Sequence, residues 1–189
     1  MTIDSTASLF VMLGQTAEKT VAKIDNVVPK ETLLISKEQD LAAVVPDIVR
    51  KAVEASEPYK LFFFFESYLR DLLVEVLSKE GTVPNWYEKV PKDVQDEVEK
   101  LEATEEMKSW MSLGSRDKSA LLTLPQLLKV IEQNWKEGFD DLIRDKGLIQ
   151  EARLLVHLRN TICHMSIIPA EEVERIKQTM RDWFRVVAP

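Results

Sequence analysis

The chain has 189 residues, 45% of them hydrophobic and 30% charged, which is typical of a globular protein with one good core. Its net charge of −7 argues against a surface that binds long nucleic acid by electrostatics alone. The longest apolar run, Leu61 to Phe65, is too short to span a membrane, and the N-terminus lacks the basic and apolar regions of a signal peptide. With the single cysteine Cys163 no intramolecular disulfide can form, so a reducing, cytoplasmic location is expected.

The pattern of apolar residues predicts an all-α protein. Only five glycines occur, no segment alternates like a strand, and apolar residues recur at helical spacing. A first amphipathic helix is expected over residues 8–28, ending at Pro29. A weaker helix should follow Ser36 and reach about Ser56, broken or kinked at Pro46. A strong helix should enter after Pro58 and close at Gly81.

The second half of the chain continues with helices. An acidic helix is expected beyond Pro91, followed by a loop over residues 113–122. Thr123 and Gln126 form the pattern of a capping box, which predicts the start of a helix that runs to Gly147. Further helices are expected over residues 148–165 and from Pro169. This last helix should bury Val173, Ile176, Met180, Trp183 and Phe184.

The run of four phenylalanines, residues 62–65, lies on the strong third helix. Consecutive residues on a helix point all the way round its axis, so at least one ring must meet something other than the main core. The N-terminal arm and a second protomer are the two candidates.

One arginine interrupts the apolar stripe of the helix over residues 148–165. At 100° per residue, Arg159 falls in the middle of the stripe that carries Ala152, Leu155, Ile162 and Cys163. A guanidinium stays charged in a protein, so when buried it needs a paired acid or a bound anion. Arg159 is therefore a snorkelling side chain, half of a structural ion pair, or the ligand of an anion such as an RNA phosphate.

Asn160 and His164 lie four residues apart on the flank of this helix. At that spacing both side chains can act on one group at the edge of the buried face. A histidine near a helix end is often only a partner of the helix dipole. Beside a cation that can bind phosphate, it is also a candidate acid or base.

A supporting acid stands on the phenylalanine-rich helix. Glu66 lies at the margin of its apolar face, with Arg70 four residues later. The pair could be an ordinary ion pair within one helix. Alternatively, Glu66 could orient Arg159 across the interface between two helices.

Other kinds of chemistry are disfavoured. The chain has no glycine-rich phosphate loop and no CxxC motif, and its two histidines lie roughly 10 Å apart along one helix, too far to share a metal. Cys163 projects to the apolar face, which predicts a buried core thiol. No metal and no cofactor are expected.

These residues resemble the HEPN superfamily. The segment from Arg159 through Asn160 to His164 fits the arginine, polar residue, short spacer and histidine pattern of the superfamily. The stretch FFFFESYLRDLLVEVL, residues 62–77, is similar to an early HEPN helix with a Glu-x-x-Leu-Arg core. The resemblance covers about residues 58–187. It implies an antiparallel four- to five-helix bundle over residues 58–189, with residues 1–57 as an N-terminal helical extension packed on it.

The resemblance also implies a function. Many HEPN modules are metal-independent endoribonucleases that dimerise with both motifs facing one cleft, in toxin, defence or RNA-processing roles. Arg159 would stabilise charge on the scissile phosphate, Asn160 would position it, and His164 would act as acid and base. Glu66 and Arg70 would support them. Partners would be RNA, a second copy and an antitoxin or regulatory protein.

Two departures from the family pattern keep an alternative open, and the first is that residues 1–57 lie outside the usual core of the family. HEPN toxins regulated by a nucleotidyltransferase usually carry a tyrosine two residues after the histidine, where this chain has Ser166. Some HEPN modules do not cut RNA and serve in RNA or nucleotide binding, dimerisation or protein interaction. On a regular helix Arg159 and His164 also point about 140° apart, so one site could hold both only at a cleft edge or where the helix is distorted.

Overall fold

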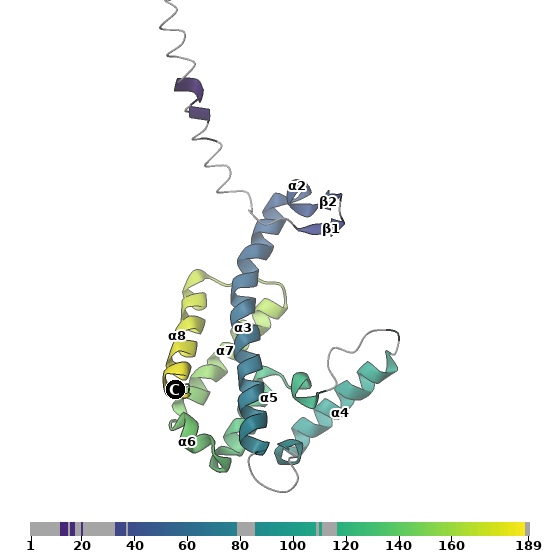
Figure 1. The fold of residues 1–189 in the computed structure, drawn as a ribbon, viewed down its shortest axis with the longest axis vertical. Helices are drawn as coiled ribbons and strands as arrows, with labels where there is room; N and C mark the ends of the chain where they lie inside the picture. Colours follow the sequence, from purple (N-terminus) through teal and green to yellow (C-terminus); the bar gives the residue numbers. More distant parts are fainter. Residues whose placement is uncertain are drawn as a thin grey trace, which may run out of the picture. The chain divides into compact units, whose positions relative to one another are not determined.

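The computed structural model describes residues 12–14, 16–17, 20, 33–36, 38–78, 86–108, 110 and 117–187. These residues are mainly helical, which confirms the expected all-α class (Figure 1). The helix expected over residues 8–28 and the helix end expected at Gly81 fall largely outside the described residues. None of the described helices combines the length and the apolar character needed to cross a membrane.

The chain divides into two compact units, Met1–Glu57 and Pro58–Pro189. In the first unit, strands β1 (Leu34–Ser36) and β2 (Gln39–Asp40) form an antiparallel pair that the apolar pattern did not predict. Helix α2 (Leu41–Val44) follows at once, because the Asp40 side chain caps it by accepting a hydrogen bond from Ala42 N. The single weak helix predicted after Ser36 is therefore wrong in its first part.

Helix α3 (Pro46–Ser78) differs from its predicted bounds. It starts at Pro46, because the first N–H groups of a helix have no partner within the helix and a proline there loses no hydrogen bond. It continues through Pro58. The predicted start after Pro58 is wrong, since a proline inside a long helix removes one hydrogen bond without ending the helix.

The second unit is a helical bundle. After α3 come the 3-10 helix η1 (Trp86–Lys89), α4 (Lys92–Met107), η2 (Lys118–Leu121), α5 (Leu124–Gln133), η3 (Trp135–Glu137), α6 (Phe139–Ile143), α7 (Gly147–Cys163) and α8 (Ala170–Val187). Helix α7 contacts both α5 and α8. The bundle core is built from completely buried side chains of α3, α5, α7 and α8, among them Phe65, Leu69, Leu127, Ile131, Leu155 and Trp183.

The helix predicted from Thr123 to Gly147 is divided into α5, the 3-10 helix η3 and α6. Its start is confirmed, because Thr123 is the N-cap of α5 and its backbone N–H donates to Gln126 Oε1 at 2.8 Å. Helix α5 ends at Gln133, and after η3 the chain turns at Gly138, whose φ of 113° lies in the left-handed region that favours glycine. This turn starts the short helix α6 in a new direction.

The four phenylalanines divide between core and surface. Phe62 and Phe65 are buried, and the Phe65 ring meets Trp183 edge to face at 5.5 Å between centroids. Phe63 and Phe64 are 64% and 55% exposed. The expectation that part of this run faces away from the core is met, and the identity of its partner stays a prediction.

Candidate active site

One buried carboxylate joins helices α3 and α7. Glu66 projects from α3, and its side chain is 9% exposed. Its Oε1 accepts a hydrogen bond from Arg159 Nε of α7 at 2.8 Å, and its Oε2 accepts one from Arg70 Nη2 at 3.0 Å. Both alternatives for Glu66 are thus present together, the pair within α3 and the pair across the helix interface.

This cluster carries an excess of positive charge. Glu66 supplies one negative charge, whereas Arg70 and Arg159 supply two positive charges. The hydrogen bond that Arg159 donates to Glu66 raises the pKa of the Arg159 guanidinium above its ordinary value, against the opposing effect of burial. Arg159 therefore stays charged, and it uses only one of its five N–H donors on Glu66.

A pocket of about 190 Å³ opens over this cluster. Glu66, Arg70 and Arg159 form its polar wall, and Arg70 Nη2 also donates to the Leu122 carbonyl at 3.2 Å. Its apolar wall includes Tyr59 and Phe63, which are 55% and 64% exposed. A small pocket with fixed guanidinium groups and flat aromatic sides suits an anionic group attached to an apolar or aromatic one. The remaining lining residues are Phe62, Ile162 and Cys163.

Asn160 and His164 lie beside this pocket in the sequence but do not line it. Both are exposed. Asn160 lies in the last turn of α7, and His164 follows directly after its last residue, Cys163. His164 is the C-cap, and Met165 follows in the left-handed region with a φ of 59°. Met165 N donates to the Ile162 carbonyl and Ser166 N to the Thr161 carbonyl, which together form a Schellman turn. The helix thus ends abruptly at His164.

A comparison with protein-family models identifies the family of this bundle. Residues 60–188 match the model described as Swt1-like HEPN, a span that holds α3 from Lys60, the Glu66 cluster and the whole motif. The chain belongs to the Swt1-like HEPN family. HEPN domains include ribonuclease-type and nucleotide-binding modules, and they often dimerise and bind RNA. Comparisons with curated proteins and with solved structures gave no match.

The three residues of the HEPN motif do not all lie in the pocket. Arg159 meets Glu66 and Arg70 in the pocket, whereas Asn160 and His164 lie on the exposed end of α7. The roles assigned to these five residues stay predictions. Among the described residues, no three histidine, cysteine, aspartate or glutamate side chains gather as metal ligands would.

Part of this HEPN pocket was not predicted from the sequence. Cys163 was expected in the core, but it is exposed and lines the pocket, because it lies one helical turn after Arg159. Tyr59, Phe63, Glu66 and Arg70 follow each other at steps of four, three and four residues along α3. This spacing marks one side of a helix, so the sequence alone carries a signal that groups the four residues.

The turn after the HEPN histidine stores backbone strain. Met165 is 90% exposed, so burial of its side chain does not offset the energetic cost of its left-handed φ. We expect Met165→Gly to raise the free energy of unfolding by about 0.5–1 kcal/mol. Leu154→Gly, at a 68% exposed position inside α7, should lower it by about 1 kcal/mol. Chemical denaturation of both variants checks this, and equal losses would exclude strain at Met165.

Proposed function

We propose that this chain is a metal-independent endoribonuclease that works as a homodimer. The observation that carries the proposal is the Arg159–Glu66–Arg70 cluster, which gives the HEPN arginine a fixed position in an open pocket. An arginine whose position is set before substrate binds can stabilise transition-state charge without first being reorganised.

Arg159 is the group that binds the scissile phosphate. Its Nε–H is occupied by Glu66, and the terminal nitrogens of the guanidinium remain to donate to phosphate oxygens. Arg70 adds a second positive charge to the same pocket. The exposed rings of Tyr59 and Phe63 offer flat faces to a base next to that phosphate.

His164 supplies acid–base catalysis, and Asn160 positions either the histidine or the phosphate. The imidazole removes the proton from the ribose 2′-hydroxyl, the 2′-oxygen attacks phosphorus, and the bond from phosphorus to the 5′-oxygen breaks. The leaving 5′-oxygen takes a proton from an imidazolium. The products are a 2′,3′-cyclic phosphate and a 5′-hydroxyl. In a dimer, two copies of His164 and two of Arg159 are available to one strand.

The biological role that fits this chemistry is that of a cytoplasmic toxin, defence enzyme or RNA-processing enzyme. A ribonuclease in a toxin role would need an antitoxin or another regulatory protein to restrain it. This assignment rests on the HEPN family and on the proposed reaction.

The test is cleavage of single-stranded RNA by the purified chain in excess EDTA. We expect fragments ending in a 2′,3′-cyclic phosphate, and a rate about 10²-fold lower for Arg159→Ala, because a preorganised donor to the phosphate is lost. Arg153→Ala is the matched control, since Arg153 lies on the same helix and pairs with Glu132 outside the pocket. A wild-type chain that leaves RNA intact, or cleavage by Arg159→Ala at the wild-type rate, contradicts the proposal.

A second candidate function is a non-catalytic module that binds RNA, a nucleotide or a partner protein. The exposure of His164 outside the pocket lining favours it, because a binding pocket needs Arg159 but no general base. In that case Arg159→Ala would lose RNA binding, His164→Ala would keep it, and no fragments would form.

A further inference from the structure

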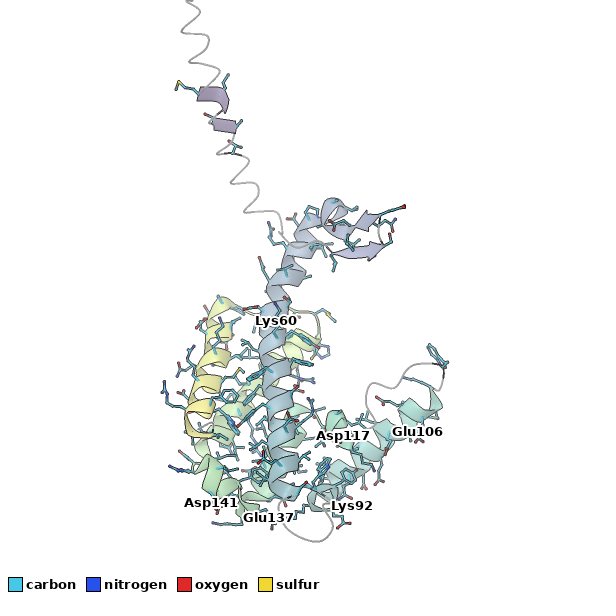
Figure 2. All side chains as sticks on the ribbon, in the orientation of Figure 1. Lys60, Lys92, Glu106, Asp117, Glu137 and Asp141 are labelled. Carbon is cyan, nitrogen blue, oxygen red and sulfur yellow. The ribbon has the colours of Figure 1, made fainter. Side chains whose placement is uncertain are left out.

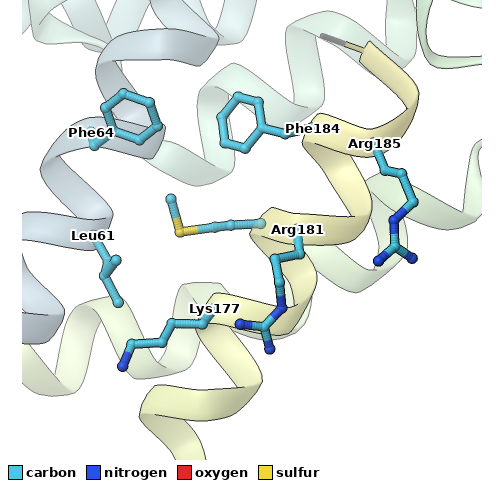
Figure 3. A pocket seen from close by; sticks show the side chains of 7 residues that line it. Leu61, Phe64, Lys177, Arg181, Phe184 and Arg185 are labelled. Atoms are coloured by element: carbon cyan, nitrogen blue, oxygen red, sulfur yellow. The ribbon is translucent and has the colours of Figure 1, made fainter. Parts of the chain in front are cut away.

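A second hollow lies between helices α3 and α8. It has a volume of about 560 Å³ and uses residues of α3 that do not line the Arg159 pocket. Its floor is apolar, with Leu61 and Phe64 from α3 opposite Phe184 from α8 (Figure 3). Met180 of α8 also lines it. Phe64 is 55% exposed and stacks at an angle on Phe184, with ring centroids 5.6 Å apart. We call this hollow the α3/α8 groove.

The rim of the α3/α8 groove is basic. Lys177, Arg181 and Arg185 follow each other at steps of four residues, which places them in one row along α8 (Figure 3). Among the described residues, no acidic side chain lines the groove. This row of three positively charged side chains contrasts with the net charge of −7 of the whole chain.

The middle cation of this row is the least neutralised. Lys177 has a salt bridge to Glu174 at 3.0 Å, and Arg185 has one to Asp182 at 3.4 Å. Arg181 instead donates from Nη2 to the neutral amide oxygen of Gln178 at 2.9 Å. Among the described residues, Arg181 is therefore the rim cation that has no acidic partner and can pair with an acid of whatever occupies the groove.

An apolar floor with a cationic rim fits an amphipathic helix that has acidic edges. Such a helix would bury its apolar face on the floor and set its carboxylates against the rim. A nucleic acid strand fits less well, because the aliphatic side chains of Leu61 and Met180 offer no flat surface for stacking bases.

The same chain carries a segment of this kind at the end of α4. Met107, the last residue of α4, and Trp110, beyond its end, are 78% and 82% exposed, whereas Leu101, 44% exposed, lies on the side of α4 that carries buried Val94 and Val98. Glu105 and Glu106 stand among them, and Figure 2 shows the Glu106 side chain at the outer end of α4. Within the described part of the chain neither glutamate has a salt bridge, whereas Asp93, Asp96 and Glu102 earlier on α4 each pair with a lysine.

We propose that the α3/α8 groove receives the C-terminal half of α4 from a second copy of this chain. Within one copy, Val94 and Val98 are buried in the core and hold α4 in place, and α4 and α8 lie on opposite sides of α3 (Figure 1). The contact must therefore be intermolecular. Reciprocal exchange between two copies closes a dimer, and one-way docking builds an open chain. The contact is independent of the proposed ribonuclease activity and of a dimer formed through the HEPN motif.

Two charge-reversed variants test this contact. Arg181→Glu/Arg185→Glu reverses the groove rim, and Glu105→Lys/Glu106→Lys reverses the end of α4. Followed by sedimentation velocity over a range of protein concentrations, each variant should associate at least about tenfold more weakly than the wild type, since like charges would face each other. Arg175→Glu is the matched control, because Arg175 is an exposed residue of α8 outside the groove.

Mixing the two variants gives the decisive result. Acidic α4 from the first variant can dock on the basic groove of the second, and basic α4 from the second on the acidic groove of the first, so the mixture should recover wild-type association. Neither a folding defect nor a dimer through the motif predicts such recovery. A wild-type chain without groove-dependent association overturns the proposal, as does a mixture that stays dissociated. Loss of RNA binding by the groove variant with unchanged association would instead assign the groove to RNA.

Discussion

Replacing Glu66 by alanine is expected to lower the free energy of unfolding by about 3 kcal/mol or more, which is the usual cost of removing one partner from a buried ion pair. The carboxylate is 9% exposed and forms salt bridges to both Arg70 and Arg159 in this cluster. Its removal leaves two guanidinium groups facing each other at a partly buried interface. Chemical denaturation of the variant measures the loss, with exposed Glu151→Ala on α7 as a control that should change stability by less than about 0.5 kcal/mol.

A double-mutant cycle separates the ion pair from its surroundings. In the Glu66→Ala background, Arg159→Ala should cost less than it does in the wild type, because the charge that it removes is no longer compensated. A Glu66→Ala variant whose free energy of unfolding lies within about 1 kcal/mol of the wild-type value would show that the cluster contributes little to stability.

Glu66→Gln separates stability from the position of Arg159. The amide keeps the shape of the side chain and one acceptor oxygen, so the variant should fold better than Glu66→Ala. It removes the negative charge that holds both arginines, so RNA cleavage should still fall. Equal cleavage by Glu66→Gln and wild type would mean that hydrogen bonding alone holds Arg159 in place.

The helices were predictable where apolar spacing and a local signal agree. The capping box at Thr123 and the apolar stripe of α8 are of this kind, since each depends on residues within a few positions of one another. The helix start predicted after Pro58 and the helix predicted to run through Gly138 were wrong for the same physical reason. A proline ends a helix only when the rest of the helix cannot outweigh one lost hydrogen bond. A glycine breaks one only when the surrounding packing favours a positive φ.

Three predicted site residues, Glu66, Arg70 and Arg159, meet in the pocket, whereas their contacts were not predictable from the sequence. The position of Arg159 in an apolar stripe left three interpretations open: a snorkelling side chain, an ion pair with an acid, and a contact with an RNA phosphate. Glu66 is 93 residues away in the chain, so only the packing of α3 on α7 could show that it meets Arg159. Cys163 shows the opposite error, because a helical wheel assigns a side to each residue but does not show where the neighbouring helix stops covering that side.

His164→Ala is expected to lower the rate of RNA cleavage by about 10³-fold, within the range that general acid–base catalysis contributes. The same change should leave the free energy of unfolding within about 0.5 kcal/mol of the wild type, because His164 is exposed at the C-cap of α7. This small effect on stability distinguishes His164→Ala from Glu66→Ala, for which a large loss of stability is expected.

The neighbouring histidine provides the control for that result. His157 is also exposed on α7 but lies outside the motif, so His157→Ala should cleave RNA at close to the wild-type rate. A mixture of His164→Ala with Arg159→Ala then tests the shared cleft, since a mixed dimer carries one intact histidine and one intact arginine on different chains. If each reaction centre takes its histidine and its arginine from different protomers, the mixture should regain activity that neither variant has alone. Equal activity of wild type and His164→Ala would exclude the acid–base mechanism and leave the binding module as the function of this HEPN domain.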